Sequence, residues 1–286
     1  MTAPAPVRPR EFALVSLEQL IERQNAQAAQ LFSVTTSYAL AKYLPAAATP
    51  YDGDVVWKLG QELAGISLTA QRTSSGLTAS YLQMTLRLLG SPLGKRLAIG
   101  AAVGVGAFAV RKGIDLARAY ERPMETIRYE QSQGVEPEQA RERGRLRLLS
   151  MLDTDIQLAA RDAARNVLRE SDDVSGYRRI LRPEMSRGTS CGLCVAASDR
   201  VYSVEELLPL HPGCHCGVAP IVGEHDPGRE LNEADFAALY GAAGSTAAAD
   251  LRDVEVAVKM HGELGPVLVD ARHHFRGPRA AAAAAA

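Results

Sequence analysis

The cysteines constrain this chain more than any other feature, because all four lie in one short stretch. Two of them form the turn Cys191-Gly-Leu-Cys194, and the other two follow in His211-Pro-Gly-Cys214-His-Cys216. Two thiolates separated by two residues can grip one tetrahedral cation, and a second turn carrying His and Cys can complete its coordination. The spacing therefore predicts a small lobe stapled by a metal ion, for which zinc is the expected ion.

The exact ligand set is open, because the second turn offers more donors than a four-coordinate site needs. We expect Cys191 and Cys194 to supply one half of the site. Two of the three residues His211, Cys214 and Cys216 would supply the other half. His215 is the least favoured donor, because in an extended segment its side chain points away from those of its two neighbours. A closed set of four protein ligands is structural rather than catalytic. The candidate ligands are Cys191, Cys194, His211, Cys214 and Cys216.

Other roles for these cysteines remain as alternatives. A disulfide framework suits a secreted domain, but residues 1–10 contain no apolar signal-peptide core, so export is not indicated. A redox pair normally precedes a helix beside a parallel βαβ core, and no such alternation surrounds Cys191. A cysteine hydrolase would pair Cys194 with His211, although a sequence does not show that the two side chains meet. Cysteines that are merely buried are the last alternative.

The composition is that of a globular and largely helical protein without a strong net charge. Of the 286 residues, 47% are hydrophobic but only 5% are aromatic, and alanine and glycine are abundant. This balance favours helices packed through small side chains. The 32 lysines and arginines nearly cancel the 33 acidic residues, so any contact with nucleic acid would be local.

The hydrophobic periodicity predicts a fold that is mainly α with a small C-terminal α+β lobe. In the first half, apolar residues at helical spacing indicate helices near 11–32, 34–43, 54–66 and 75–89. Strands are expected near 177–182, 198–202, 217–222, 253–260 and 267–269, and a short helix with an Asn cap near 231–240. The expected regions are a flexible arm at 1–10, a helical region at 11–122, a long amphipathic helix region at 123–175, the Cys/His lobe at 176–223, an α+β extension at 224–270 and a low-complexity tail at 271–286.

An uncharged apolar segment spans residues 97–110. It is shorter than the ~20 residues that a membrane-spanning helix needs. Gly100 and Gly104 form a small-xxx-small pair that would let another helix approach closely. We therefore expect a buried helix at a packed interface, and an interfacial or membrane-perturbing segment is the alternative.

Arginines recur at helical spacing on the predicted long helix. Arg161, Arg165 and Arg169 follow one another at i,i+4 and would line one face. Such a stripe suits phosphates or acidic partner surfaces. The alternative is a solvated face whose local ion-pair partners are Asp155, Asp162 and Glu170.

The lobe itself carries the most specific motifs of the chain. They are Tyr177-Arg-Arg-Ile, Arg187-Gly-Thr-Ser-Cys-Gly-Leu-Cys194, Ser198-Asp-Arg-Val-Tyr202, Leu207-Leu-Pro-Leu-His-Pro-Gly-Cys-His-Cys216 and Pro220. Together with later pieces up to Leu268, this combination resembles the minor head proteins of tailed phages related to the F protein of phage Mu, in the form carried by phages of actinobacteria. The resemblance covers roughly residues 150–268.

The resemblance implies a structural protein of the virion, made in the host cytoplasm and located in the capsid interior or at the portal vertex. The implied partners are the portal and major capsid proteins, with packaged DNA as a further candidate. A small-molecule substrate is not implied. Some members of the group are labelled capsid maturation proteases, but this chain has no Gly-x-Ser-x-Gly elbow and no Ser/His/Asp set that stands out, so we expect no enzyme activity.

Overall fold

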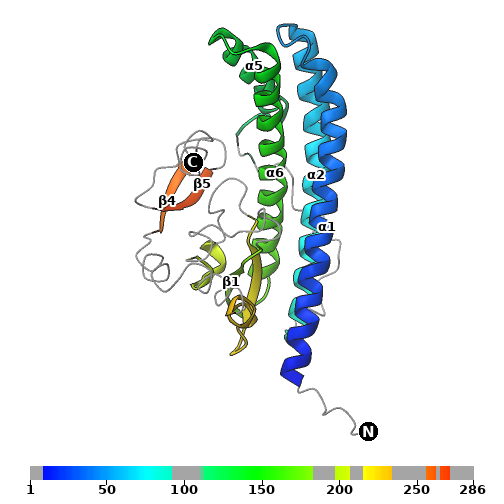
Figure 1. Cartoon of the computed structure of the whole chain (residues 1–286). Helices are drawn as coiled ribbons and strands as arrows, with labels where there is room; N and C mark the ends of the chain where they lie inside the picture. Colours follow the sequence, from blue (N-terminus) through cyan, green and yellow to red (C-terminus); the bar gives the residue numbers. More distant parts are fainter. Residues whose placement is uncertain are drawn as a thin grey trace.

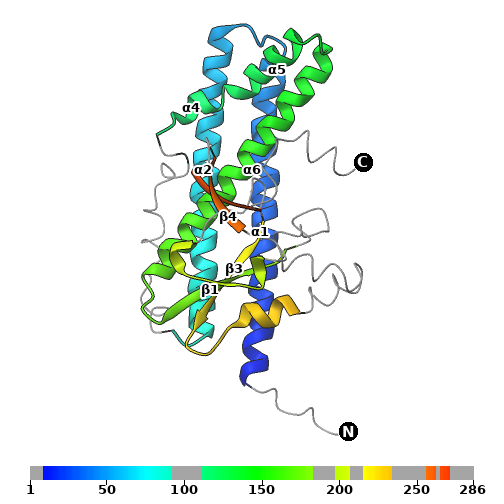
Figure 2. The same ribbon diagram turned by 90° about the vertical axis from the view of Figure 1, so that its left-hand side faces the viewer.

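Three long helices lie side by side, and a small antiparallel sheet packs on one side of them (Figures 1 and 2). The computed structural model describes residues 9–91, 111, 113–182, 197–206, 215–233, 256–261 and 265–270. The expected fold class, mainly α with a small α+β part on the C-terminal side, is confirmed at this level. The predicted segment 97–110 and the tail 271–286 lie outside the described residues.

The first two helices form a hairpin. Helix α1 spans Pro9–Ala46 and α2 spans Gly53–Leu88, so each is longer than about 50 Å at a rise of 1.5 Å per residue. The prediction of two separate helices in each stretch is wrong. Around residue 33 and across residues 67–74 the sequence has no proline or glycine that would end a helix. Helical propensity therefore continues through both predicted gaps.

The turn between α1 and α2 contains the predicted helix start. The carboxylate of Asp52 accepts hydrogen bonds from the backbone N–H groups of Asp54 (3.0 Å) and Val55 (3.2 Å). These donors have no partner inside the helix, so the cap stabilises its first turn by roughly 1 kcal/mol.

The third long helix is α6, which spans Pro137–Arg169 and confirms the predicted long amphipathic helix. Its apolar face is buried against α2, and the shorter α5 (Arg122–Ser132) packs on its first half. A single turn, α4 (Leu116–Ala119), packs against α2.

Gly144 brings α6 into close contact with its neighbours. A Cβ atom at this position would lie 2.8 Å from both the carbonyl oxygen of Pro123 and Cγ1 of Ile127, and it would also overlap the hydroxyl of Tyr43. That hydroxyl donates a hydrogen bond to the carbonyl of Arg141 (2.9 Å). Glycine at this position therefore lets α1, α5 and α6 meet at one end of the bundle.

The small sheet has three antiparallel strands in the order β2-β1-β3. The central strand β1 spans Val174–Ile180, and it pairs with β2 (Val201–Tyr202) and with β3 (Gly217–Val222). A short 3-10 turn, η4 (Val204–Glu206), follows β2. The three strands were predicted, because short apolar runs bounded by Gly, Ser and Asp are typical of strands.

The sheet shares its apolar core with the helices. Tyr177 and Val218 from the sheet are buried in one cluster with Leu82 of α2 and Val167 of α6. The hydroxyl of Tyr81 on α2 donates to the carbonyl of Val218 (3.0 Å). The sheet therefore packs against both α6 and α2.

Beyond the sheet the chain forms one more helix and one hairpin. Residues 227–233 are helical, and the hairpin pairs β4 (Val256–His261) with β5 (Gly265–Asp270). Both strands were predicted. The helix begins before the predicted residue 231, and its N-terminal turn is capped by Asp226, whose carboxylate accepts from the Arg229 N–H (3.2 Å).

Candidate functional site

The structure describes only part of the predicted metal site. Cys216 and the neighbouring His215 lie directly before β3. Among the described residues, no group of three His, Cys, Asp or Glu side chains is arranged to hold a metal ion. Whether zinc binds here therefore stays a prediction. The candidates outside the described residues are Cys191, Cys194, His211 and Cys214, and so are the helix-packing candidates Gly100 and Gly104.

His215 is held against helix α6 by both ring nitrogens. Its Nε2 lies 3.3 Å from a carboxylate oxygen of Asp153, and its Nδ1 lies 2.9 Å from the amide nitrogen of Gln157. The two partners are spaced one helical turn apart on α6. This geometry fits the tautomer in which Nε2 carries the proton. His215 thus contacts two side chains of α6 and connects the start of β3 to that helix.

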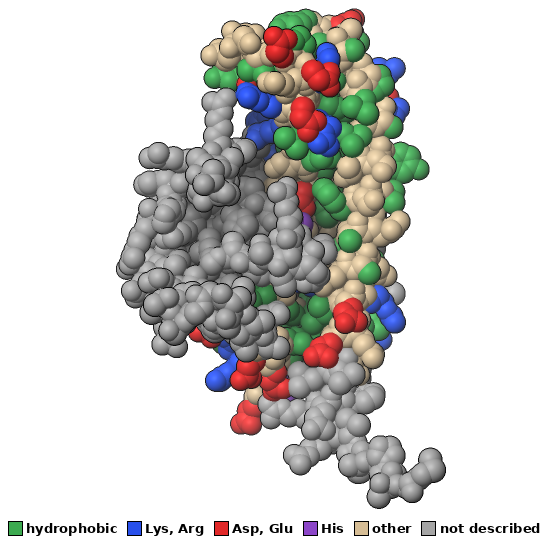
Figure 3. Space-filling view, viewed as in Figure 1, with side chains coloured by type: hydrophobic (Ala, Val, Ile, Leu, Met, Phe, Trp, Pro, Cys, Tyr) green, Lys and Arg blue, Asp and Glu red, His purple; other side chains and the backbone are tan. Residues whose placement is uncertain are grey.

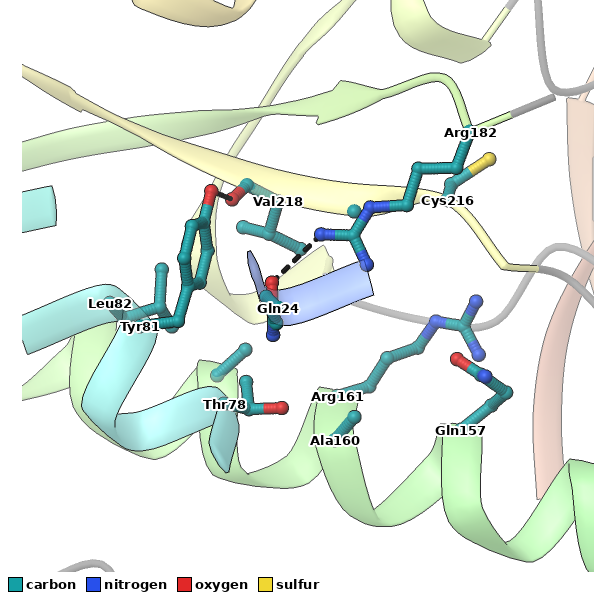
Figure 4. Close-up of a pocket in the computed structure, with 12 residues that line it drawn as sticks. Gln24, Thr78, Tyr81, Leu82, Gln157, Ala160, Arg161, Arg182, Cys216 and Val218 are labelled. Atoms are coloured by element: carbon teal, nitrogen blue, oxygen red, sulfur yellow. Dashed lines mark hydrogen bonds between the residues drawn. The ribbon is translucent and has the colours of Figure 1, made fainter. Parts of the chain in front are cut away.

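Cys216 is half-buried at the edge of the core that the sheet shares with the helices. Its sulfur points away from Arg161 and Gln157 on α6 (Figure 4). Adjacent residues 215 and 216 thus engage different surroundings, as the alternation of an extended segment predicts.

The predicted arginine stripe is not one surface. Arg161 is only 6% exposed, Arg165 is half-buried and Arg169 is exposed. The prediction of a partner surface is therefore wrong for Arg161, which is buried and lines a cavity together with Val218 of β3 and Arg182. The guanidinium of Arg169 forms a two-pronged ion pair with Glu205 of η4, with Nε 2.7 Å from Oε1. The local partners expected from the sequence did not include this residue.

A small cavity lies where the stripe was expected. It has a volume of about 40 Å³ and opens between α1, α2, α6 and the start of β3 (Figure 4). Its polar lining comes from elements far apart in the sequence, so no local pattern could have revealed it. The described polar residues that line it are Gln24, Thr78, Tyr81, Gln157, Arg161, Arg182 and Cys216.

A second polar cluster is buried inside the bundle and was also missed. Asp155 on α6 is fully buried, and one carboxylate oxygen lies 2.8 Å from Nε and 2.7 Å from Nη2 of Arg111. The other oxygen accepts hydrogen bonds from the hydroxyls of Tyr120 (2.8 Å) and Ser67 (3.2 Å). The available signal was an acidic residue in register with the apolar face of α6, between Leu152 and Ile156.

Burial dominates the electrostatics of this cluster. It raises the pKa of Asp155, although the Arg111 guanidinium and the two hydroxyl donors act in the opposite direction. Burial together with the Asp155 carboxylate raises the pKa of the Tyr120 phenol well above its usual range. The cluster therefore keeps the phenol neutral and connects Ser67 of α2 and Asp155 of α6 to Arg111 and Tyr120.

The motif residues of the lobe hold the sheet together. The ring of Tyr177 stacks on that of Tyr202 at 5.3 Å, and the buried guanidinium of Arg179 lies 5.0 Å from the Tyr202 ring centre. Next to it, Arg178 contacts both carboxylate oxygens of Asp226, with Nε at 3.0 and 3.1 Å. Buried ion pairs and cation–π contacts of this kind fix the relative position of strands.

Asn232 has a different role from the predicted helix cap. It is fully buried inside the helix 227–233. Its side-chain oxygen accepts from the Leu181 N–H (3.1 Å), and its amide nitrogen donates to the Arg179 carbonyl (2.7 Å). The asparagine therefore pins this helix to the end of β1, because a buried amide must satisfy its hydrogen bonds.

Comparisons with protein-family models, with curated proteins and with solved structures found no match. In the described part of the chain, no helix combines the length and apolar character needed to cross a bilayer.

Proposed function

We propose that this chain is a minor head protein of a tailed phage, associated with the portal and acting in head assembly or in DNA packaging and ejection. The proposal rests on the motifs of the lobe and on what their described residues do. Tyr177, Arg178, Arg179 and Tyr202 stack and pair within the sheet, and Asp199 receives a hydrogen bond from Arg178 at its carbonyl (2.7 Å). Motif residues that stabilise the sheet fit a structural protein of the phage head better than they fit an enzyme.

The cavity beside Cys216 is too small to serve as the substrate site of a hydrolase. Its volume of about 40 Å³ is far below the roughly 300 Å³ at which sites for small molecules begin, so it has no room for a peptide. The neighbouring His215 is already engaged by Asp153 and Gln157, so it is not poised as a general base. A hydrolase built from Cys194 and His211 is the rival function, and it predicts a thiol at residue 194 that is alkylated rapidly.

We further propose that the cysteines and His211 form a zinc staple. Of the candidate ligands, Cys216 is the one that the structure describes, and its sulfur points away from Arg161 and Gln157 on α6. A staple predicts about one zinc ion per chain by elemental analysis and thiols that react slowly until a chelator is added. Rapid alkylation of the native protein without zinc would contradict it.

The surface that we propose for contact with the portal is the middle of α1. Residues 24–41 contain no charged side chain, and Figure 3 shows this uncharged band between charged groups at both ends. Val34 and Tyr38 are 42% and 66% exposed there. An uncharged surface with exposed apolar side chains is typical of a protein–protein contact.

Co-purification with portal-containing particles tests the head-protein proposal. We expect the wild-type chain in these particles and expect Tyr38→Glu to be depleted, because a buried charge opposes the contact. Tyr129→Glu on α5 is the matched control, since Tyr129 is 59% exposed and lies outside the uncharged band. Absence of the wild-type chain from the particles would refute the proposal. Equal incorporation of the two variants would refute only the assignment of the surface.

A further inference from the structure

The outer face of α2 carries a repeat with the period of a coiled coil. Six residues between positions 58 and 76 follow one another at alternating spacings of four and three, which is the spacing of a heptad seam. The seam lies opposite the buried face of the helix, to which Leu63, Ser67 and Ala70 belong. We call it the α2 seam, and it consists of Lys58, Glu62, Gly65, Thr69, Arg72 and Gly76.

Two glycines of the α2 seam are not required by the packing of the described residues. A Cβ atom at Gly60, on the buried face of the same helix, would lie 2.6 Å from the carbonyl oxygen of Ala117, so a close contact explains that glycine. At Gly65 and Gly76 an added Cβ atom would meet no atom within 4 Å. Glycine weakens a helix relative to alanine, so its presence at these two positions fits a surface that another backbone approaches closely.

The charges of the α2 seam are complementary to those of a second copy of the same helix. Glu62 and Arg72 lie five positions on either side of residue 67, and Gly65 and Thr69 lie two positions on either side of it. In an antiparallel pair of helices centred at this residue, Glu62 of each copy faces Arg72 of the other. In a parallel pair, by contrast, each of these charges faces its own kind. The charge pattern therefore favours a second copy in the antiparallel orientation.

Two polar groups of the α2 seam keep hydrogen-bond partners when the seam is buried. The Thr69 hydroxyl donates to the carbonyl of Gly65 in its own helix (3.0 Å). One carboxylate oxygen of Glu62 lies 3.3 Å from Nζ of Lys42 on α1, and the other oxygen can accept from a guanidinium. Neither group is therefore left unsatisfied when water is excluded from the seam.

We propose that the α2 seam binds the same seam of a second copy of this chain, in an antiparallel pair of helices centred at residue 67. The small residues Gly65 and Thr69 allow a close approach at the centre. The half-buried Ile66 and Leu68 lie beside them and become further shielded from water. The seam itself has no large apolar side chain, so we expect a reversible dimer with a dissociation constant in the micromolar range. This surface lies on a different helix from the one proposed to contact the portal, so the two proposals can fail separately.

Sedimentation velocity of the full chain at concentrations between about 1 and 100 µM tests this pairing. We expect a monomer–dimer equilibrium for the wild type. Glu62→Arg and Arg72→Glu each place like charges opposite each other at both symmetric contacts, so each variant should dimerise at least about tenfold more weakly. An equimolar mixture of the two variants should recover dimerisation to within about threefold of the wild type, because the mixed dimer again pairs opposite charges at both contacts.

Matched controls reverse the same charges at other exposed positions. Glu125→Arg on α5 and Arg23→Glu on α1 should dimerise within about twofold of the wild type. Far-UV circular dichroism checks that each variant is folded, and a misfolded variant would not be rescued by mixing. A wild type that stays monomeric throughout this range overturns the proposal, and so does a dimer that neither Glu62→Arg nor Arg72→Glu weakens. A mixture that dimerises no better than the single variants also overturns it, because the two charges would then not face each other.

Discussion

The phenol oxygen of Tyr120 lies 2.8 Å from the carboxylate of Asp155, which also holds the guanidinium of Arg111. All three side chains are buried, at 0%, 0% and 4% exposure. The apolar core of the bundle therefore contains a buried cluster of polar side chains. Such a cluster is favourable only while every member has its partner, because a buried group that loses its partner bears the full cost of desolvation.

Replacing Asp155 with alanine should strongly destabilise the bundle. The substitution leaves the Arg111 guanidinium buried without its carboxylate, and we expect a loss of about 3–5 kcal/mol in the free energy of unfolding. Urea denaturation monitored by circular dichroism measures it. Adding Arg111→Met to the first change should restore part of the loss, because both charges are then gone. Additive losses in the double variant would show that the pair is not coupled.

The protein should lose stability steeply in alkali. Burial raises the pKa of the phenols of Tyr43, Tyr81, Tyr120 and Tyr202 above 10.0 in the folded state. In the unfolded chain these phenols ionise near pH 10, while in the folded chain they stay neutral. Their contribution is therefore fully present below about pH 10 and is lost as the pH rises above it.

Thermal unfolding between pH 8 and pH 12 checks this expectation, with tyrosinate absorbance recorded in parallel. Each unit of pH above 10 should cost up to about 1.4 kcal/mol for every phenol that stays protonated in the fold. Tyr120→Phe removes one such phenol, so its stability should fall less steeply with pH than that of the wild type. An unchanged slope in this variant would argue against the neutral phenol in the cluster.

Replacing a glycine of the long helices with alanine should lower the stability at one position and raise it at another. Gly144→Ala places a methyl group against Ile127 and the Pro123 carbonyl, and we expect a loss of about 1–3 kcal/mol. Gly65→Ala on α2 meets no atom within 4 Å and should raise stability by about 0.4–1 kcal/mol, since alanine favours the helix. Denaturation midpoints of the two variants measure the contrast. A stabilising Gly144→Ala would mean that α6 does not approach α1 and α5 so closely.

The sequence predicted those elements that its own periodicity defines. The apolar spacing on α6 and the short apolar runs of β1, β3, β4 and β5 are local signals, and these elements were found. Each of the helices α1 and α2 was wrongly predicted as two helices. A change in the spacing of apolar residues was interpreted as a helix end, although no helix-breaking residue lies there.

The candidate site was less accessible to sequence reasoning, because tertiary contacts build it. Arg182 meets Gln24 across 158 positions of the chain, and no local pattern links the two. Arg161 follows the same i,i+4 spacing as Arg165 and Arg169, yet only Arg161 is buried. Spacing predicts which residues share a face of a helix, but it does not predict what packs on that face.

Removing a bound metal should loosen the lobe without unfolding the helices. A lobe of this size that stood alone would unfold when a chelator removed its metal ion, because its own apolar core is small. In the structure Tyr177 and Val218 are buried against Leu82 and Val167, so the sheet takes part of its stability from the bundle.

With EDTA we expect faster alkylation of the cysteines. The far-UV helical signal should change by no more than about a tenth. Cys216→Ser should reproduce this behaviour without chelator, and Ser203→Ala on the exposed edge after β2 is the matched control. A chelator that abolished the helical signal would show that the staple, and not the shared core, holds the whole chain together.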